Sequence, residues 1–247
     1  MSEAAAGSPQ PIIEFRSEMT VELVRAAARD ADVLFSARVS TAGEQSLEEI
    51  DGDPSRSTGL INYLMRDRHG TPFEHSSMTF YVRAPIFVFR EFMRHRIASY
   101  NEESGRYREL RPVFYVPGPE RRLVQVGKAG HYTFEPGTVE QHALVDSEIR
   151  SSCARSYESY QRMLAAGVAR EVARAVLPVT IYSSMYVTMN ARSLMNFLSL
   201  RTKREDSRFP SYPQREIEMV AEKMEALWIE LMPLTHAAFE LNGRVAP

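Results

Sequence analysis

The sequence contains a single cysteine, Cys153, among 247 residues. One cysteine excludes an internal disulfide and a cysteine metal cluster. No apolar run approaches the roughly 20 residues that a membrane-spanning helix needs. The first residues, MSEAAAGSPQ, lack the basic start and apolar centre of a signal peptide. These absences predict a soluble, cytoplasmic protein that has no membrane partner.

Neither sign of charge predominates in the chain. It has 30 lysines and arginines against 32 aspartates and glutamates, which leaves a net charge of −2. Proteins built mainly to bind nucleic acid usually have a net basic balance, so we expect no nucleic-acid partner. Apolar residues make up 44% of the chain, enough for a sizeable core. We expect a disordered tail at 1–10, one domain at 11–242 and a C-terminal tail at 243–247.

Common phosphate-binding and nucleophile motifs are also missing. The sequence has no GxGxxG, no GxxxxGK[ST] and no GxSxG, which excludes Rossmann, P-loop and nucleophile-elbow sites. Ser104 has no obvious paired base. Cys153 lies on the apolar stripe of a predicted helix, where a cysteine is more often a core residue than a nucleophile. His69 and His75 lack a convincing third ligand, so we predict no metal site.

The first half of the chain alternates between helical and strand patterns. We expect strands at 12–15 and 76–84. We also expect three helices: one that begins after Thr20 as its cap and runs to 31, one that begins at Ser57 as its cap and ends at Gly70, and one after Pro85. The buried stripe of the last helix is predicted to be Ile86, Phe89 and Met93. Residues 101–105 are predicted to be loop, as are most of residues 41–56.

The second half is mostly helical, apart from one long loop. Residues 105–138 contain five glycines and four prolines and predict an extended loop with room for a hairpin. Helical spacing recurs at 139–166, 169–178, 191–201 and 213–232. Residues 179–189 favour a strand, although the same pattern also fits a helix. The predicted fold class is α+β, a single helix-rich domain.

One stretch, RHRIASYNEESGRY at 94–107, concentrates cations, carboxylates and hydroxyls. Arginine stays charged and presents a planar fork of donors that matches phosphate. Several converging arginines would select a polyanion such as a nucleotide, whereas any single one could be a solvated surface residue. The candidates lie at ends or edges of predicted elements: Arg94, Arg96, Arg106, Arg174, Arg192 and Arg201.

Two further groups have both a structural and a functional interpretation. Glu102 and Glu103 could form salt bridges with nearby arginines, or accept hydrogen bonds from sugar hydroxyls. The turn HGTPFEH at 69–75 could be a plain structural turn, or it could stack an imidazole on a flat heterocycle. The residues alone leave both pairs of alternatives open.

Several of these segments resemble one family. Arg94-His95-Arg96, seven residues and then Ser104 resemble the RHRxxxxxxxS signature of the flavin-dependent thymidylate synthases. Other segments are similar to that family in the same order: HGTPFEH, NEESGRY, FYVP, AREVARAVLP and NARSLMNFLSLR. Together they span about 69–201, and PQREIE near 213 also fits. Each motif is moderately specific, but six in order make a strong resemblance.

The resemblance implies a fold and a reaction. Members of the family have their own α+β fold with an antiparallel sheet, and they form homotetramers whose active sites combine several subunits. They make thymidylate (dTMP) from deoxyuridylate (dUMP). The methylene comes from methylenetetrahydrofolate, the hydride from reduced FAD and the reducing equivalents from NADPH. The expected chain is thus one catalytic domain, 11–242, that acts on dUMP.

The resemblance also implies site residues. The expected flavin-binding residues are His69, Thr71, Arg94, His95, Arg96, Glu102, Asn190, Ala191, Arg192 and Asn196. The expected dUMP-binding residues are Glu91, Phe92, Met93, Arg94, Glu102, Glu103, Ser104, Gly105, Arg106, Arg174 and Arg201. Arg201 is the expected catalytic residue, because a fixed cation can stabilise the ionised pyrimidine without a cysteine nucleophile. Ser104 would position the substrate.

The chain departs from the family pattern at Glu91, where many relatives carry glutamine. A carboxylate near a phosphate would repel it unless an arginine intervenes. Three other functions also merit a test: a nucleotide sensor without catalysis, an RNA- or DNA-binding module at 94–111, and a flavin oxidase that consumes NADPH without methylating anything. Dependence of turnover on dUMP would separate the last from a synthase.

Overall fold

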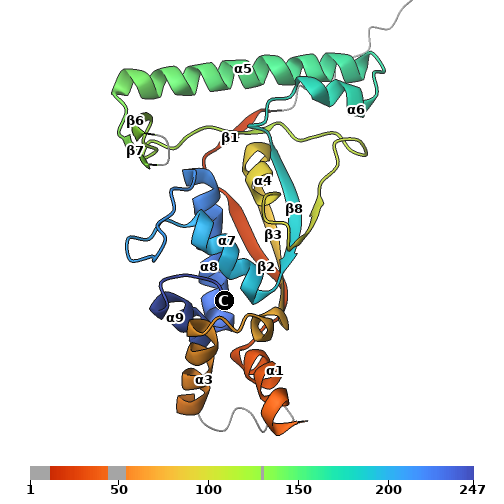
Figure 1. The fold of residues 1–247 in the computed structure, drawn as a ribbon. Coiled ribbons are helices and arrows are strands. Elements are labelled where there is room, and N and C mark those ends of the chain that lie inside the picture. The colour runs from red at the N-terminus through yellow and green to blue at the C-terminus, as the bar shows by residue number, and fades with distance from the viewer. Residues whose placement is uncertain (1–11, 44–53, 129–130) are drawn as a thin grey trace, which may run out of the picture.

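The computed structural model describes residues 12–43, 54–128 and 131–247. Its centre is a four-stranded sheet in the order β2-β3-β8-β4, and all neighbouring strands are antiparallel (Figure 1). The strands are β2 (Thr20–Ala27), β3 (Ser77–Pro85), β8 (Tyr182–Met189) and β4 (Ser99–Glu102). This arrangement confirms the expected α+β class with an antiparallel sheet.

One face of the sheet is packed and the other is open. Met78, Phe80 and Val82 alternate along β3 and are fully buried, as the period of a half-buried strand requires. They share a core with α4 (Ile86–Phe92), α7 (Ala191–Arg201) and α8 (Arg215–Leu231). On the opposite face, Tyr81 and Tyr186 lie together with ring centroids 5.8 Å apart.

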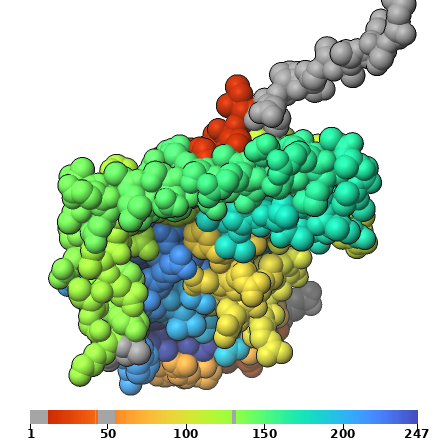
Figure 2. All heavy atoms as spheres, turned by 90° about the horizontal axis from the view of Figure 1, so that it is seen from above, coloured from red at the N-terminus to blue at the C-terminus, as the bar shows by residue number. Residues whose placement is uncertain are grey.

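The remaining elements lie at the two ends of the sheet. The helices α1, α3 and α9 gather at one end, and α5 crosses the other (Figure 1). Seen from above, α5 forms a ridge with the α6 segment beside it (Figure 2). These elements are α1 (Asp30–Ala42), α3 (Pro54–Arg66), η1 (Thr71–Glu74), α5 (Val139–Ala165), α6 (Arg170–Ala173), η2 (Arg174–Val176) and α9 (Pro233–Leu241).

Four short strands complete the structure. β1 (Glu14–Arg16) pairs in parallel with β5 (Val113–Tyr115), and β6 (Val124–Lys128) forms a hairpin with β7 (His131–Glu135). The hairpin lies within 105–138, where we expected an extended loop with room for a hairpin. A second core joins β5 to α5 and includes Cys153, which is buried as predicted. No helix of the described residues is long and apolar enough to cross a membrane.

The strongly periodic segments were predicted correctly. The strand expected at 76–84 is β3, and the helices expected at 139–166, 191–201 and 213–232 are α5, α7 and α8. The strand interpretation of 179–189 is confirmed from Tyr182 onward. The strand expected at 12–15 begins two residues later, at Glu14. The expected tail at 1–10 and most of the loop at 41–56 lie outside the described residues.

The helix expected from Thr20 was wrong. Residues Thr20–Ala27 form the edge strand β2, and α1 begins only at Asp30. The local pattern VELVRAAARDA has helical spacing, but hydrogen bonds to β3 outweigh that preference. The expected caps of the next helix were also wrong. It begins at Pro54 and ends at Arg66, and the residue with left-handed backbone is Arg68 (φ 66°), not Gly70 (φ −74°).

Three smaller expectations also need correction. Residues 101 and 102 belong to β4 instead of a loop. The helix predicted at 169–178 is shorter, one turn of α6 followed by η2. On α4, Phe89 is buried as expected, but Met93 is 43% exposed and lies after the helix end. Val88 and Phe92 fill the core in its place, since α4 stops after seven residues.

Candidate functional site

The RHR motif begins in a turn at the end of α4. The helix ends at Phe92, and the chain turns through Arg94 and His95 before it enters β4. The hydroxyl of Tyr100 lies 2.9 Å from the carbonyl oxygen of Phe92 and 2.7 Å from that of His95. Burial raises the pKa of Tyr100 to about 12, so this hydroxyl keeps its proton and remains a donor. Arg94 and Arg96 are exposed, whereas His95 is half-buried.

Arg201, the last residue of α7, reaches back to this turn. Its Nε donates to Nε2 of His95 over 3.0 Å, and its Nη1 donates to Oε2 of Glu91 over 2.7 Å. The His95 ring also packs edge-on against Phe197, with centroids 4.9 Å apart. The three polar side chains therefore form one connected, half-buried group that spans α4 and α7.

The charges in this group follow from their surroundings. Burial, and then the nearby Arg201 cation, lowers the pKa of His95 to about 4, so the ring is neutral at physiological pH. A neutral ring that accepts at Nε2 carries its proton on Nδ1. Burial raises the pKa of Glu91; Arg201 opposes the shift and the Glu216 carboxylate adds to it. Arg201 thus supplies the positive charge beside the Glu91 carboxylate.

A second part of the predicted site surrounds Ser104. Gly105 is buried, and a Cβ there would lie 3.0 Å from Leu110 Cδ1 and 3.2 Å from Arg174 Cδ. Glycine at this position therefore lets the stem of Arg174 run close to the backbone beside Ser104. The backbone N–H of Arg106 donates to Ser104 Oγ over 3.3 Å. The predicted dUMP-binding residues of the loop and of η2 are thus neighbours in space.

Some of the charged side chains around Ser104 form ion pairs and others do not. Arg106 forms an ion pair with Glu171 over 2.8 Å. Glu103 pairs with Arg108 over 3.1 Å and also accepts from Ser184, so for Glu103 the salt-bridge interpretation is confirmed. Desolvation raises the pKa of Glu102 although more than a third of the residue is exposed. Glu102, Glu103 and Ser104 line one cavity of about 370 Å³.

Gly70 and Glu74 of the 69–75 turn lie beside Arg192 at the start of α7. The side chain of Asn190 caps this helix by accepting from the N–H of Ser193 over 2.8 Å. Arg192 donates through Nε to the main-chain oxygen of Pro247, the last residue of the sequence, over 2.6 Å and pairs with Glu74 at close range. A Cβ on Gly70 would lie 2.6 Å from Arg192 Cζ, so only glycine leaves room for this guanidinium.

The other members of this group are placed as follows. His69 stacks on Tyr63 with ring centroids 5.6 Å apart and an interplanar angle of 28°. Asn196 is exposed and donates to the carbonyl oxygen of Arg192. The backbone N–H of Ala191 is already used, because it donates to Ser76 over 3.0 Å. The N–H groups of Ala191 and Ser193 therefore have partners within the chain, and the helix dipole is what favours an anion at this end of α7.

The structure restricts one predicted dUMP-binding residue, Phe92, and adds one residue that sequence reasoning missed, Tyr100. The Phe92 side chain is fully buried and stacks on Phe197 at 4.8 Å, and its carbonyl oxygen already accepts from Tyr100. Met93, in contrast, is exposed at the turn. Tyr100 fixes that turn, although no spacing rule links a strand tyrosine to carbonyl groups five and eight residues earlier.

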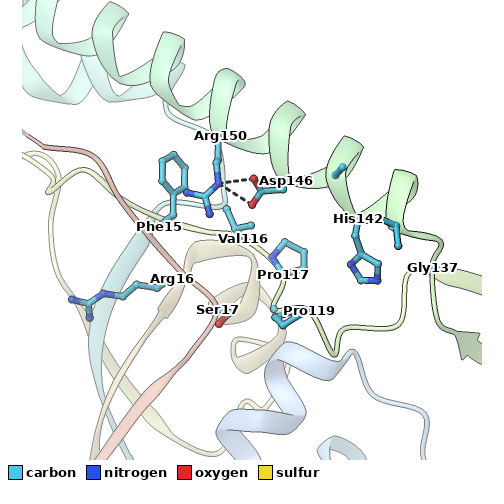
Figure 3. A pocket seen from close by; sticks show the side chains of 13 residues that line it. Phe15, Arg16, Ser17, Val116, Pro117, Pro119, Gly137, His142, Asp146 and Arg150 are labelled. Atoms are coloured by element: carbon cyan, nitrogen blue, oxygen red, sulfur yellow. Dashed lines mark hydrogen bonds and ion pairs between the residues drawn. The ribbon is translucent and has the colours of Figure 1, made fainter.

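The larger cavity, of about 700 Å³, lies elsewhere, between β1, the segment 116–119 and α5 (Figure 3). Its cations are already engaged. Arg150 is held by both carboxylate oxygens of Asp146 at 2.8 Å and lies 4.6 Å from the Phe15 ring centroid, and Arg16 pairs with Glu14. None of the predicted site residues lines this cavity. The smaller cavity is favoured instead because the predicted residues Glu102, Glu103 and Ser104 line it, although Arg108 in its lining is likewise paired.

Comparisons of the whole chain with known proteins give one consistent match. The profile of the family described as "Thymidylate synthase complementing protein" matches residues 22–234. A protein named flavin-dependent thymidylate synthase from Streptomyces coelicolor is 69% identical over 248 residues and 100% of both chains. One from Tropheryma whipplei is 62% identical, over 94% of this chain and 97% of its own.

Solved structures give the same assignment. Two structures of the UMP/dUMP methylase PolB from Streptomyces cacaoi, bound with 5-Br UMP and 5-Br dUMP, align with TM-scores of 0.88 and 0.90. They are 54% and 55% identical to this chain and cover 96% and 95% of it and 100% of their own chains. The profile match and the full-length identity to the Streptomyces coelicolor protein show that this chain belongs to the family of flavin-dependent thymidylate synthases.

Proposed function

We propose that this protein makes dTMP from dUMP, with methylenetetrahydrofolate as carbon donor, FAD as cofactor and NADPH as reductant. The observation that carries the proposal is the placement of Arg201. A neutral His95 and Glu91 hold its guanidinium beside the turn that begins the RHR motif. The names of the curated relatives, up to 69% identical over the whole chain, support the same reaction.

Arg201 acts in this proposal as a fixed cation near the pyrimidine. Its bonds to His95 and Glu91 use N–H groups on Nε and Nη1, and Nη2 lies 3.5 Å from the Glu91 carbonyl oxygen. Guanidinium has five N–H donors, so both terminal nitrogens retain one for a substrate oxygen. A preorganised cation stabilises the charge that develops on the ring without reorganising during the reaction. No cysteine nucleophile is needed for this step.

Arg174 and Ser104 would bind the nucleotide phosphate. Arg174 is exposed and passes over Gly105, and no ion pair is found for it among the described residues. Ser104 adds a hydroxyl donor in the same place. Arg106 is partly neutralised by Glu171, which makes it the weaker phosphate ligand of the two arginines. Glu102, which has no arginine partner within salt-bridge distance in the described chain, is suited to accept from sugar hydroxyls.

The start of α7 would hold FAD. The residues fit a dinucleotide because the N-terminal dipole of α7 favours phosphate, and because Gly70 makes room for the Arg192 guanidinium. Arg94 and Arg96 supply two exposed cations. Bound and reduced, the flavin would supply the hydride. The protein's part is to bind and orient it and to exclude water.

We further propose that the working enzyme is a homotetramer in the cytoplasm, with its active sites shared between subunits. In one chain, the predicted residues at the start of α7 and those around Ser104 belong to separate groups. Large apolar side chains beside the motif are exposed, namely Met93 (43%), Ile97 (76%) and Tyr107 (79%). A second subunit would cover such residues. Light scattering of the purified protein in the presence of FAD should give the mass of four chains.

A second substrate deserves a test because the PolB structures are of a UMP/dUMP methylase. The proposal favours dUMP, since the relatives named thymidylate synthases are more similar in sequence (69% and 66% against 54% and 55%). Parallel assays with UMP and dUMP decide between them. A higher kcat/KM for UMP would contradict the proposed substrate.

The experiment that tests the proposal combines binding and turnover. The purified protein is loaded with FAD, freed of excess flavin, and its visible spectrum is recorded before and after addition of dUMP. We expect a retained flavin whose spectrum shifts with the nucleotide, and dTMP when methylenetetrahydrofolate and NADPH are added. NADPH oxidation that does not depend on dUMP would indicate an oxidase. Flavin that is retained but indifferent to dUMP would indicate a different function for the arginines.

A further inference from the structure

A buried ionic cluster joins the C-terminal segment to α8 and α9. Arg244 is only 3% exposed, and its Nη1 donates to Glu225 over 2.7 Å and to Glu240 at close range. His236 Nε2 lies 3.0 Å from the same Glu225 oxygen. Burial alone would raise the pKa of Glu225, but the hydrogen bonds from His236 and Arg244 lower it. Glu225 is therefore ionised and neutralised by Arg244.

The cluster is an ionic network and not a metal site. Potential ligand atoms of Glu225, His236 and Glu240 lie within 4.8 Å of one another, which is close enough for a cation. However, the guanidinium of Arg244 already contacts both carboxylates and supplies the positive charge there. The Arg244 guanidinium also lies 4.9 Å from the Phe239 ring centroid, which fixes its plane.

The cluster reaches the residues that directly follow Arg201. Arg244 donates through Nη2 to the hydroxyl of Thr202 over 2.9 Å, and that hydroxyl donates to the Leu198 carbonyl oxygen over 2.7 Å. The backbone N–H of Lys203 donates to Glu218 over 2.9 Å. Arg204 pairs with Glu225 over 3.2 Å. Each of the three residues after Arg201 is therefore tied to α8 or to the C-terminal segment.

These contacts lie at the C-terminal end of α7, where a helix has the fewest hydrogen bonds of its own. α7 ends at Arg201, and its last carbonyl groups have no partner within the helix. The backbone and the hydroxyl of Thr202 both bond to the Leu198 carbonyl oxygen, so Thr202 closes the last turn. Arg244 in turn fixes the rotamer of Thr202. The position of the Arg201 backbone therefore depends on a side chain more than 40 residues later, and Arg244 makes no contact with His95 or Glu91.

We propose that Arg244 is a positioning residue for Arg201, acting through Thr202. The inference rests on the proposed function, in which Arg201 is the cation beside the pyrimidine. A shift of about 1 Å at a reacting group can cost on the order of 10²-fold in rate. Buried ionic networks add little net stability over apolar packing, but they can select one geometry. A network that terminates on the residue after the catalytic arginine is suited to that use.

The test compares two equivalent substitutions. Thr202→Val removes the hydroxyl that Arg244 contacts and keeps the side-chain volume. Thr235→Val is the matched control, because Thr235 is equally buried (0% against 2% exposed) and its hydroxyl donates to Asp30 over 2.6 Å. Thr202→Ser restores the hydroxyl. Arg244→Lys keeps a charge for Glu225 but lacks the fork that reaches Thr202.

We expect Thr202→Val to lower kcat/KM for dUMP about tenfold, the factor that corresponds to one hydrogen bond to a charged group. Thr202→Ser should recover most of the loss. The Thr235→Val variant should have a melting temperature lowered as much as that of the Thr202→Val variant, but its kcat/KM should equal that of the wild type. The double variant Thr202→Val with Arg244→Lys should have a kcat/KM no lower than that of the less active single variant. Both substitutions remove the same hydrogen bond, so their effects should not add. Equal kcat/KM in the two valine variants would overturn the proposal.

A second readout does not need turnover. Amide hydrogen exchange over residues 196–208 should accelerate in Thr202→Val and Arg244→Lys but not in Thr235→Val. Unchanged exchange in that segment would overturn the positioning role even in an active enzyme. If the wild-type protein shows no dUMP-dependent turnover, the proposed function fails, and the exchange data still decide whether Arg244 holds the end of α7.

Discussion

Arg201 and His95 are 106 residues apart in the chain, and the arginine donates to Nε2 of the histidine over 3.0 Å. Burial lowers the pKa of His95, and the permanent cation beside it adds to that effect. The central histidine of the RHR motif therefore acts as a neutral acceptor that orients Arg201. Glu91 completes the arrangement from the other side.

This relationship predicts a pH dependence of stability. Unfolded His95 takes up a proton near pH 6.5, whereas in the folded protein its pKa is about 4. The unfolded state therefore binds more protons between these values, and stability is fully present above pH 6.5 and is lost as the pH falls toward 4. Between pH 7.5 and 5, wild type should lose about 1 kcal/mol more of its free energy of unfolding than His95→Asn, after allowance for the partial exposure of the ring.

Urea unfolding of both proteins at pH 7.5, 6 and 5 measures this difference. Groups that titrate in both proteins, such as Glu91, largely cancel in the comparison. Equal losses in wild type and variant would show that His95 is protonated normally and is not held by Arg201.

Arg201→Lys tests the shape of the cation as well as its charge. Lysine keeps the positive charge but cannot contact His95 and Glu91 simultaneously through a rigid fork. We expect kcat for dTMP formation to fall on the order of 10²-fold, typical for loss of one preorganised electrostatic contact. FAD should still bind, because the start of α7 is unchanged, and retained flavin absorbance is the check. Near-wild-type kcat would remove Arg201 from the catalytic role.

Gly70→Ala tests the expected flavin end of the site. The new methyl group would lie 2.6 Å from Arg192 Cζ and 2.9 Å from the Pro247 main-chain oxygen, so the guanidinium has to move. Because Arg192 forms charge-assisted contacts, we expect FAD to bind about tenfold more weakly. Fluorescence titration with FAD measures the change, and Gly59→Ala, where the added Cβ meets open space, is the control. Unaltered FAD affinity would contradict a role for Arg192 in flavin binding.

Ser104→Ala separates positioning from nucleophilic attack. If Ser104 only binds dUMP, its loss removes one hydrogen bond to a charged ligand, and KM for dUMP should rise about tenfold while turnover remains measurable. The half-buried position of Ser104 beside the backbone of Arg106 is consistent with that role. A variant that binds dUMP normally but produces no dTMP would instead indicate that the serine reacts.

The sequence alone was enough to predict most long elements and to name the segments that we propose form the site. α5, α7 and α8 were predicted because each buries one face of a periodic helix, and that period is visible in the residues. Three segments were recognised as candidate parts of the site: the RHR stretch, the 69–75 turn and the 190–201 segment. Cys153 was correctly assigned to the core from its place on an apolar stripe.

Only the tertiary structure decided how those segments meet. β2 is a strand because β3 offers it a ladder of hydrogen bonds, a long-range partner that local helical spacing cannot report. The bonds of Arg201 to His95 and Glu91 join residues more than 100 positions apart. The tie from Arg244 to Thr202 likewise depends on where α9 returns the chain. Residue type determined what each side chain can do, while packing of the helices on the sheet determined which partner it has.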